Sequence, residues 1–113
     1  MSLNYRAIVE NLQDEKVINL MRELGADRYI ETDTYIIFPT ICHNVDANEA
    51  SMKLYYYKNN KIFYCYTNCE GQSIFKFLEH YYQTREIEYD WYNDVYLVAE
   101  NCSLNSELRF ETT

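Results

Sequence analysis

Residues 62–71, IFYCYTNCEG, place two cysteines at the end of a β-prone run and around a short polar turn. Three residues separate Cys65 from Cys69, and an adjacent pair, Cys42 and His43, lies upstream, with His43 22 residues before Cys65. Three thiols and an imidazole in two clusters form a common donor set of structural zinc sites. The sequence therefore predicts a Zn²⁺ site made by Cys42, His43, Cys65 and Cys69.

The length and cysteine content agree with a small metal-stabilised protein. A chain of 113 residues has the length of one domain with a modest core, and a metal site adds folding free energy directly. Its four cysteines also allow two disulfides in a secreted protein. Because the chain has no signal segment and no apolar run long enough to span a membrane, free thiols in the cytoplasm are the favoured interpretation.

Charge is unevenly distributed along the chain. The formal net charge is −8, which on its own disfavours a nucleic-acid partner. Between Ser51 and Leu78, however, four lysines and one glutamate give +3, which leaves −11 on the rest. A polyanion responds to the local field, so this basic segment is a candidate contact. The alternative is that the lysines only keep exposed strands soluble.

Helical and strand patterns alternate along the first third of the chain. Apolar residues with helical spacing predict a helix over about 4–24, with a break near residues 13–15, Asp14 as a cap and Gly25 as the stop. Residues 29–38 are rich in Tyr, Ile and Thr and predict one or two strands with a turn near residues 31–33.

The central segment predicts a hairpin. Residues 52–57 and 61–66 are aromatic, β-prone runs, and Asn59-Asn60 between them predicts a two-residue turn. Ser73 is placed to cap a helix over about 73–84, and Asp90 to cap another over about 90–100. We therefore expect one α+β domain over residues 1–113. It would be a zinc ribbon (a small antiparallel β-sheet with metal knuckles, about 29–72) flanked by N-terminal and C-terminal helices.

From Tyr35 to Tyr81 the chain resembles the zinc-ribbon domain at the N-terminus of bacterial and phage DNA primases. That family has a Cys-Pro-x-His cluster, a β-hairpin, an aromatic-Cys-x-x-Cys-Gly knuckle and a helix that starts with a small polar residue and carries Phe. The corresponding segments here are Phe38-Pro39-Thr40-Ile41-Cys42-His43, Lys53-Leu54-Tyr55-Tyr56-Tyr57, Ile62-Phe63-Tyr64-Cys65-Tyr66 and Gly71-Gln72-Ser73-Ile74-Phe75-Lys76-Phe77-Leu78.

The chain departs from the family pattern at both clusters. Cys42 and His43 are adjacent, and three residues rather than two separate Cys65 from Cys69. Neighbouring side chains on an extended strand point to opposite faces, so Cys42 and His43 can share one ion only if the backbone turns at residues 42–44. Without that turn, the fourth ligand would be Cys102, His80 or water.

The resemblance implies a binding module without a catalytic core. It implies that the ribbon recognises single-stranded template DNA for primer synthesis, in a phage or other mobile element. It also implies a partner: a separate primase catalytic domain or a helicase. We expect no membrane partner and no enzymatic activity from this chain alone, because it has no acidic cluster typical of a two-metal site.

The predicted nucleic-acid contact lies on one face of the hairpin. Binding a single strand requires aromatic rings for the bases and cations for the phosphates. Strand alternation puts Lys53, Tyr55 and Tyr57 on one face, and Tyr64 or Tyr66 are further candidates. The alternative is that these rings pack against the flanking helices. The predicted contact residues are Lys53, Tyr55, Tyr57, Lys58 and Lys61.

Two other functions compete with this interpretation. A protein-interaction adaptor would use the same zinc site and fold, with the tyrosines and the acidic helices as its docking surface. A thiol redox protein would use Cys65 and Cys69, but it lacks the Cys-x-x-Cys spacing at a helix N-terminus that lowers a thiol pKa. The adaptor is therefore the stronger alternative.

Overall fold

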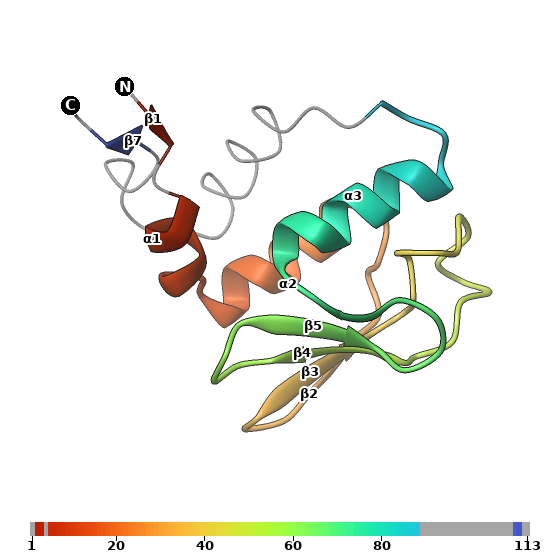
Figure 1. Ribbon diagram of the computed structural model, residues 1–113. Coiled ribbons are helices and arrows are strands. Elements are labelled where there is room, and N and C mark those ends of the chain that lie inside the picture. Colours follow the sequence, from red (N-terminus) through yellow and green to blue (C-terminus); the bar gives the residue numbers. More distant parts are fainter. Residues whose placement is uncertain (1, 4, 89–109, 112–113) are drawn as a thin grey trace.

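The computed structural model describes residues 2–3, 5–88 and 110–111 and is α+β in class. Figure 1 shows a curved sheet with helices α2 and α3 on the same side of it. Five strands pair antiparallel in chain order: β2 (Ile30–Glu31), β3 (Tyr35–Phe38), β4 (Leu54–Tyr57), β5 (Ile62–Cys65) and β6 (Glu70–Gln72). The helices are α1 (Tyr5–Glu10), α2 (Asp14–Glu23) and α3 (Ile74–Thr84), and β1 (Ser2–Leu3) pairs with β7 (Phe110–Glu111).

The sheet buries one face and leaves the other open. Strand alternation places Tyr56 and Phe63 in the core, where Phe63 stacks on Phe77 of α3 with ring centroids 4.8 Å apart. Val17 and Leu20 of α2 are fully buried in the same core. The predicted placement of Tyr55 and Tyr57 on one face of their strand is confirmed, since both are half-buried whereas Leu54 and Tyr56 are buried.

The N-terminal helical region is interrupted where the sequence indicates, but its cap differs from the prediction. Gln13 occupies the N-cap position of α2 and Asp14 is the first helical residue, so the predicted Asp14 cap is wrong. Asp14 instead lies 3.7 Å from the ammonium of Lys58. The predicted stop is confirmed: Gly25 has a φ of +105°, which favours glycine, and its N–H donates to the carbonyl of Arg22.

The central hairpin forms, but its turn is longer than predicted. Tyr57 pairs with Ile62, so the loop has four residues, Lys58 to Lys61, instead of two. The residue with positive φ is Lys61, at +61°, and its N–H donates to the carbonyl of Tyr57. Strand β6 was not expected; it follows the second cysteine and returns along β5.

Helix α3 begins as predicted. Ser73 is its N-cap, and the Ser73 side chain accepts a hydrogen bond from the N–H of Lys76 at 3.2 Å. The helix predicted over about 90–100, with its Asp90 cap, and Cys102 lie outside the described residues. Within the described part of the chain, every helix is too short or too polar to cross a bilayer.

Candidate metal centre

A tight turn after β3 brings Cys42 and His43 to the same side of the backbone. Asn44 closes the turn: its N–H and its side-chain amide both donate to the carbonyl of Thr40, and the amide also reaches the Thr40 hydroxyl at 2.9 Å. The turn at residues 42–44, on which a shared ion depends, is therefore present. It leaves Cys42 Sγ 3.5 Å from His43 Nδ1.

A second turn, the knuckle (residues 65–70), joins β5 to β6. Cys65 pairs with Glu70 across the two strands, so the four residues between them must reverse the chain. Glu70 has a φ of +59°, which completes the reversal. The extra residue between the cysteines is thus accommodated, because the longer knuckle still returns Cys69 beside Cys65.

The two turns bring the four predicted ligands together. Their ligand atoms all lie within 4.8 Å of one another. His43 Nδ1 lies 3.5 Å from Cys42 Sγ, 3.6 Å from Cys65 Sγ and 3.5 Å from Cys69 Sγ. Cys42, Cys65 and Cys69 are free cysteines. A Cys-His-Cys-Cys group this close could hold a metal ion.

Thr67 orients the histidine and one of the cysteines, a role the sequence analysis did not assign. Its hydroxyl lies 3.2 Å from His43 Nε2 and 3.2 Å from Cys65 Sγ. With Nδ1 facing the sulfurs, Nε2 carries the proton and donates to Thr67, and the Thr67 hydroxyl donates to Cys65. Only the shape of the knuckle, not its composition, reveals this chain of hydrogen bonds.

The protonation of the thiols differs across the cluster. Burial raises the pKa of Cys42, and the neighbouring sulfurs of Cys69 and Cys65 raise it further. Burial also raises the pKa of Cys69. At Cys65 burial opposes ionisation, but hydrogen bonds from Thr67 and from knuckle N–H groups outweigh it and lower the pKa to about 7. Cys65 is therefore the thiol most ready to bind a cation.

The imidazole of His43 is kept neutral. Burial lowers the pKa of His43, because the charged form loses hydration. A neutral imidazole leaves a lone pair on Nδ1, which is what a metal ligand needs.

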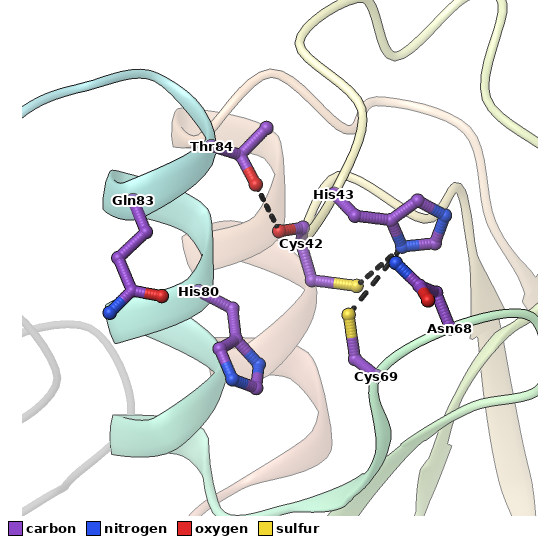
Figure 2. Close-up of a pocket in the computed structure, with 7 residues that line it drawn as sticks. All are labelled: Cys42, His43, Asn68, Cys69, His80, Gln83 and Thr84. Carbon is purple, nitrogen blue, oxygen red and sulfur yellow. Dashed lines mark hydrogen bonds between the residues drawn. The ribbon is translucent and has the colours of Figure 1, made fainter.

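Helix α3 holds the first ligand turn in place. The Thr84 hydroxyl donates to the carbonyl of Cys42 at 2.7 Å (Figure 2). The guanidinium of Arg85 lies 3.7 Å from the centroid of the Tyr81 ring. It donates to the carbonyls of Ile41, Tyr81, Asn44 and Val45 at 2.8–3.2 Å. The C-terminal end of α3 thus fixes the backbone that carries Cys42 and His43.

A polar pocket lies between α3 and the cluster, and Figure 2 shows its lining side chains. His80 belongs to this lining, but its Nδ1 lies 2.6 Å from Gln72 Oε1 and its ring is not part of the four-residue group. Its proposed use as a replacement ligand is not needed, because the turn at residues 42–44 forms. The pocket lining also includes Asn68, Gln83 and Thr84.

The predicted contact tyrosines lie on the open face of the sheet with three others. Tyr55 and Tyr57 stack with ring centroids 6.1 Å apart, and Tyr55 also lies 5.2 Å from Tyr35 and 4.9 Å from Tyr66. Tyr64 lies 4.5 Å from Tyr66. A hydrogen bond to Tyr66 is the main cause that raises the pKa of Tyr57 to about 12. The tyrosine face consists of Tyr35, Tyr55, Tyr57, Tyr64 and Tyr66.

The three predicted contact lysines have different surroundings. Lys58 pairs with Glu31 at 2.9 Å and Asp14 at 3.7 Å. The ammonium of Lys61 donates to the carbonyl of Leu12 at 2.9 Å. Lys53 is exposed, and within the described residues its side chain makes no hydrogen bond or ion pair. The charge of Lys58 is therefore largely offset, whereas no described residue offsets that of Lys53.

Comparison with known proteins finds similarity to part of one longer protein and finds no matching family. No family model matches the chain, and no solved structure matches it. Over 63 residues, 55% of this chain, it is 36% identical to the SPbeta prophage-derived uncharacterized protein YorJ of Bacillus subtilis (strain 168). The matched part is 16% of that relative's length. More than half of the chain is thus similar to a small part of a longer phage-derived protein.

Proposed function

We propose that this chain is a zinc-stabilised module that binds single-stranded DNA on its tyrosine face, as the template-recognition domain of a DNA primase does. The observation that carries the proposal is the position of the Cys-His-Cys-Cys group at one end of an open, five-tyrosine sheet face. Without the metal, the two turns at that end would be joined only by hydrogen bonds such as that between Thr67 and His43. The module would supply recognition, and a separate domain would supply catalysis.

Zinc is the metal that the donor set favours, and the nitrogen–sulfur distances agree with it. Ligand bonds of about 2.3 Å to sulfur and 2.05 Å to nitrogen, at tetrahedral angles, imply nitrogen–sulfur distances of about 3.6 Å. The three distances from His43 Nδ1 to sulfur are 3.5, 3.6 and 3.5 Å. Three thiolates and one imidazole also complete a four-coordinate zinc site, which leaves no open position for chemistry. A structural role follows: zinc would hold the residue 40–44 turn against the knuckle.

The tyrosine face supports a single-stranded partner better than a duplex. Its rings lie on a sheet surface, where unstacked bases can reach them, whereas duplex bases are stacked inside the helix. Each base stacked on an aromatic ring is worth about 1–3 kcal/mol.

The phage-derived relative is consistent with a module of a larger protein. Because the matched region is 16% of its length, most of that relative lies outside the similarity. A catalytic domain or a helicase contact would belong to such additional chain. This part of the proposal rests on the primase resemblance.

Metal analysis and DNA titration test the proposal together. We expect about one zinc per chain after purification without added metal. We also expect a labelled ten-nucleotide single strand to bind at least about tenfold more tightly than the matching duplex, and more weakly as salt rises from 50 to 200 mM. Zinc-loaded protein that binds neither DNA at 50 mM salt contradicts the DNA proposal.

A protein-interaction adaptor is the second candidate function. It is favoured by the internal pairing of Lys58 with Asp14 and Glu31, which reduces the positive charge that the sheet offers to phosphates. The titration separates the two candidates, because an adaptor would retain zinc but show no salt-dependent binding of single-stranded DNA.

A further inference from the structure

A corner of two aromatic rings lies at the knuckle end of the tyrosine face. Tyr55 and Tyr66 meet edge to face, with ring centroids 4.9 Å apart and ring planes at 78°. Together with Lys53 they line a pocket that is separate from the one beside the metal ligands. Tyr66 is 54% exposed, so a planar group from solvent can stack on one ring and meet the other.

Lys53 adds an available positive charge to this corner. Its side chain lines the same pocket and, among the described residues, has no carboxylate or carbonyl partner. Lys58 and Lys61, in the loop at the opposite end of β4, already interact with Glu31 and with the Leu12 carbonyl. A planar ring that carries an anionic group matches a π-surface beside an exposed ammonium, and a nucleotide has this chemistry.

Two of the candidate metal ligands flank Tyr66 in the knuckle. Tyr66 directly follows Cys65 and lies between it and Cys69 in the knuckle. Its N–H donates to the carbonyl of Lys53 at 3.0 Å, which joins the knuckle to the start of β4. An ion held by both cysteines would therefore also fix the position of the Tyr66 ring relative to Lys53 and Tyr55.

We propose that Lys53, Tyr55 and Tyr66 form a nucleotide subsite whose shape depends on the bound metal. One unstacked base stacks in the ring corner, and its phosphate contacts the Lys53 ammonium. The assignment rests on the proposed function and refines it, since it places the main contact at the knuckle and away from the loop that carries Lys58 and Lys61. It also selects Tyr66 from the two further candidates, Tyr64 and Tyr66.

Titration of zinc-loaded, full-length variants with a fluorescein-labelled dT₁₀ strand at 0.1 M salt tests the subsite. Tyr66→Ala is expected to raise Kd by about 5- to 150-fold, the range of one lost base stack. Tyr66→Phe retains the ring and is expected to stay within about twofold of wild type. Lys53→Gln is expected to raise Kd about fivefold and to make the slope of log K against log salt shallower by about 0.7.

Lys76→Gln is the matched control for charge. Lys76 lies on α3 and pairs with Glu79, so the substitution removes the same charge away from the tyrosine face. We expect Kd for dT₁₀ to change less than about twofold. Zinc content and far-ultraviolet circular dichroism, measured for every variant, identify any that fail to fold.

Separate outcomes overturn the subsite and the proposed function. If wild type binds dT₁₀ while folded Tyr66→Ala and Lys53→Gln bind equally well, the subsite assignment is wrong and single-strand binding stands. Equal losses for Tyr66→Ala and Tyr66→Phe would also overturn base stacking on this ring. If zinc-loaded wild type does not bind dT₁₀ at 50 mM salt, the proposed function itself fails and the subsite fails with it.

The metal dependence has its own measurement. Chelation of the metal from wild type is expected to raise Kd for dT₁₀ by at least the factor caused by Tyr66→Ala, because the ring is no longer fixed. Zinc added back should restore binding in wild type but not in Tyr66→Ala. Full dT₁₀ affinity in chelated, metal-free protein contradicts the coupling between the metal and the subsite.

Discussion

At the scale of single residues, Thr67 has a larger role at the metal centre than its side chain suggests. Its hydroxyl joins His43 Nε2 to Cys65 Sγ, so it fixes both the ring orientation and the thiolate. Groups that orient metal ligands in this way typically contribute 10- to 100-fold to metal affinity. The composition of the knuckle does not reveal this contribution, because it depends on where the loop places the hydroxyl.

Removal of that hydroxyl is therefore expected to weaken metal binding without loss of a ligand. Thr67→Val should lower zinc affinity by about 10- to 100-fold, measured by competition with a chromophoric chelator. Thr32→Val is the matched control. The Thr32 hydroxyl bonds to Tyr35 in the turn between β2 and β3, away from the metal centre. Equal affinities for Thr67→Val and wild type would exclude the orienting role.

The protonation of the thiols also predicts how zinc affinity depends on pH. At pH 8 Cys42 and Cys69, whose pKa values burial raises, still carry protons, whereas Cys65, with a pKa of about 7, is mostly ionised. Zinc binding must displace the remaining protons, so affinity falls as pH falls. The logarithm of affinity should rise by about 2 per pH unit near pH 8 and by about 3 near pH 6, where Cys65 is protonated too.

Chelator competition at several pH values measures this slope directly. A slope of about 1 or less near pH 8 would show that Cys42 or Cys69 is already ionised without metal as well as Cys65, contrary to the raised pKa that burial gives to both. The Cys65→Ser variant should lose the steepening near pH 7, provided that it still binds zinc.

At the scale of elements, the end of α3 acts as an anchor for the first ligand turn. Arg85 donates to the carbonyls of Ile41, Asn44 and Val45, and Thr84 donates to that of Cys42. These carbonyls belong to a loop, where they accept side-chain hydrogen bonds in place of the backbone hydrogen bonds of a helix or a sheet. The helix therefore determines the geometry of half of the candidate metal centre from outside it.

Loss of the anchor is expected to destabilise the protein and weaken the metal site together. Arg85→Ala should lower the free energy of unfolding by about 1–3 kcal/mol, because several half-buried carbonyls lose charged donors. Urea unfolding with zinc present measures it. Arg22→Ala is the control, since Arg22 makes one exposed hydrogen bond to Asn19, and a change within about 0.5 kcal/mol is expected. Equal effects would contradict the anchoring role.

The elements that could be predicted from sequence are those with a strong local pattern. The alternation in Leu54–Tyr57 and Ile62–Cys65 separates buried from open side chains, and Ser73 caps α3 through a local bond. Strand β6 has only three residues, EGQ, without alternation, and it forms because the knuckle returns it beside β5. Its existence depends on tertiary placement, which no local pattern contains.

The candidate site was predictable in its composition but not in its surroundings. The spacing of the cysteines and the histidine predicted the four residues of the group, and the structure places their ligand atoms close together. That they bind a metal stays a prediction. The partners of two lysines lie far away in the sequence. Lys58 interacts with Glu31 and Lys61 with the Leu12 carbonyl, each at least 27 residues distant. Such long-range partners cannot be inferred from a charge count along a segment.

At the scale of the whole molecule, the metal would connect two parts of the chain that lie on strands separated by β4 in the sheet. One half of the group follows β3 and the other lies between β5 and β6. Because a preformed site is absent from the unfolded chain, metal binding free energy adds to folding free energy. Thermal stability should therefore depend on zinc concentration.

Each tenfold rise in free zinc above its Kd should stabilise the protein by about 1.4 kcal/mol and raise Tm accordingly. Differential scanning calorimetry with buffered zinc measures this dependence. Cys69→Ser should abolish it, whereas Cys102→Ser, which leaves the four-residue group intact, should retain it. A Tm that does not respond to zinc in wild type, or to a strong chelator, would contradict a structural metal.

The pairing of β4 with β5 gives the metal centre a further consequence for folding. Cys65 faces the ligand turn only while Leu54 pairs with Cys65 and Tyr56 pairs with Phe63. A shift by one residue would turn Cys65 to the opposite face and bring Tyr64 into the core. Metal binding would thus stabilise only chains with the correct hairpin register, since misaligned chains could not complete the four-ligand group. Those chains would unfold and pair again.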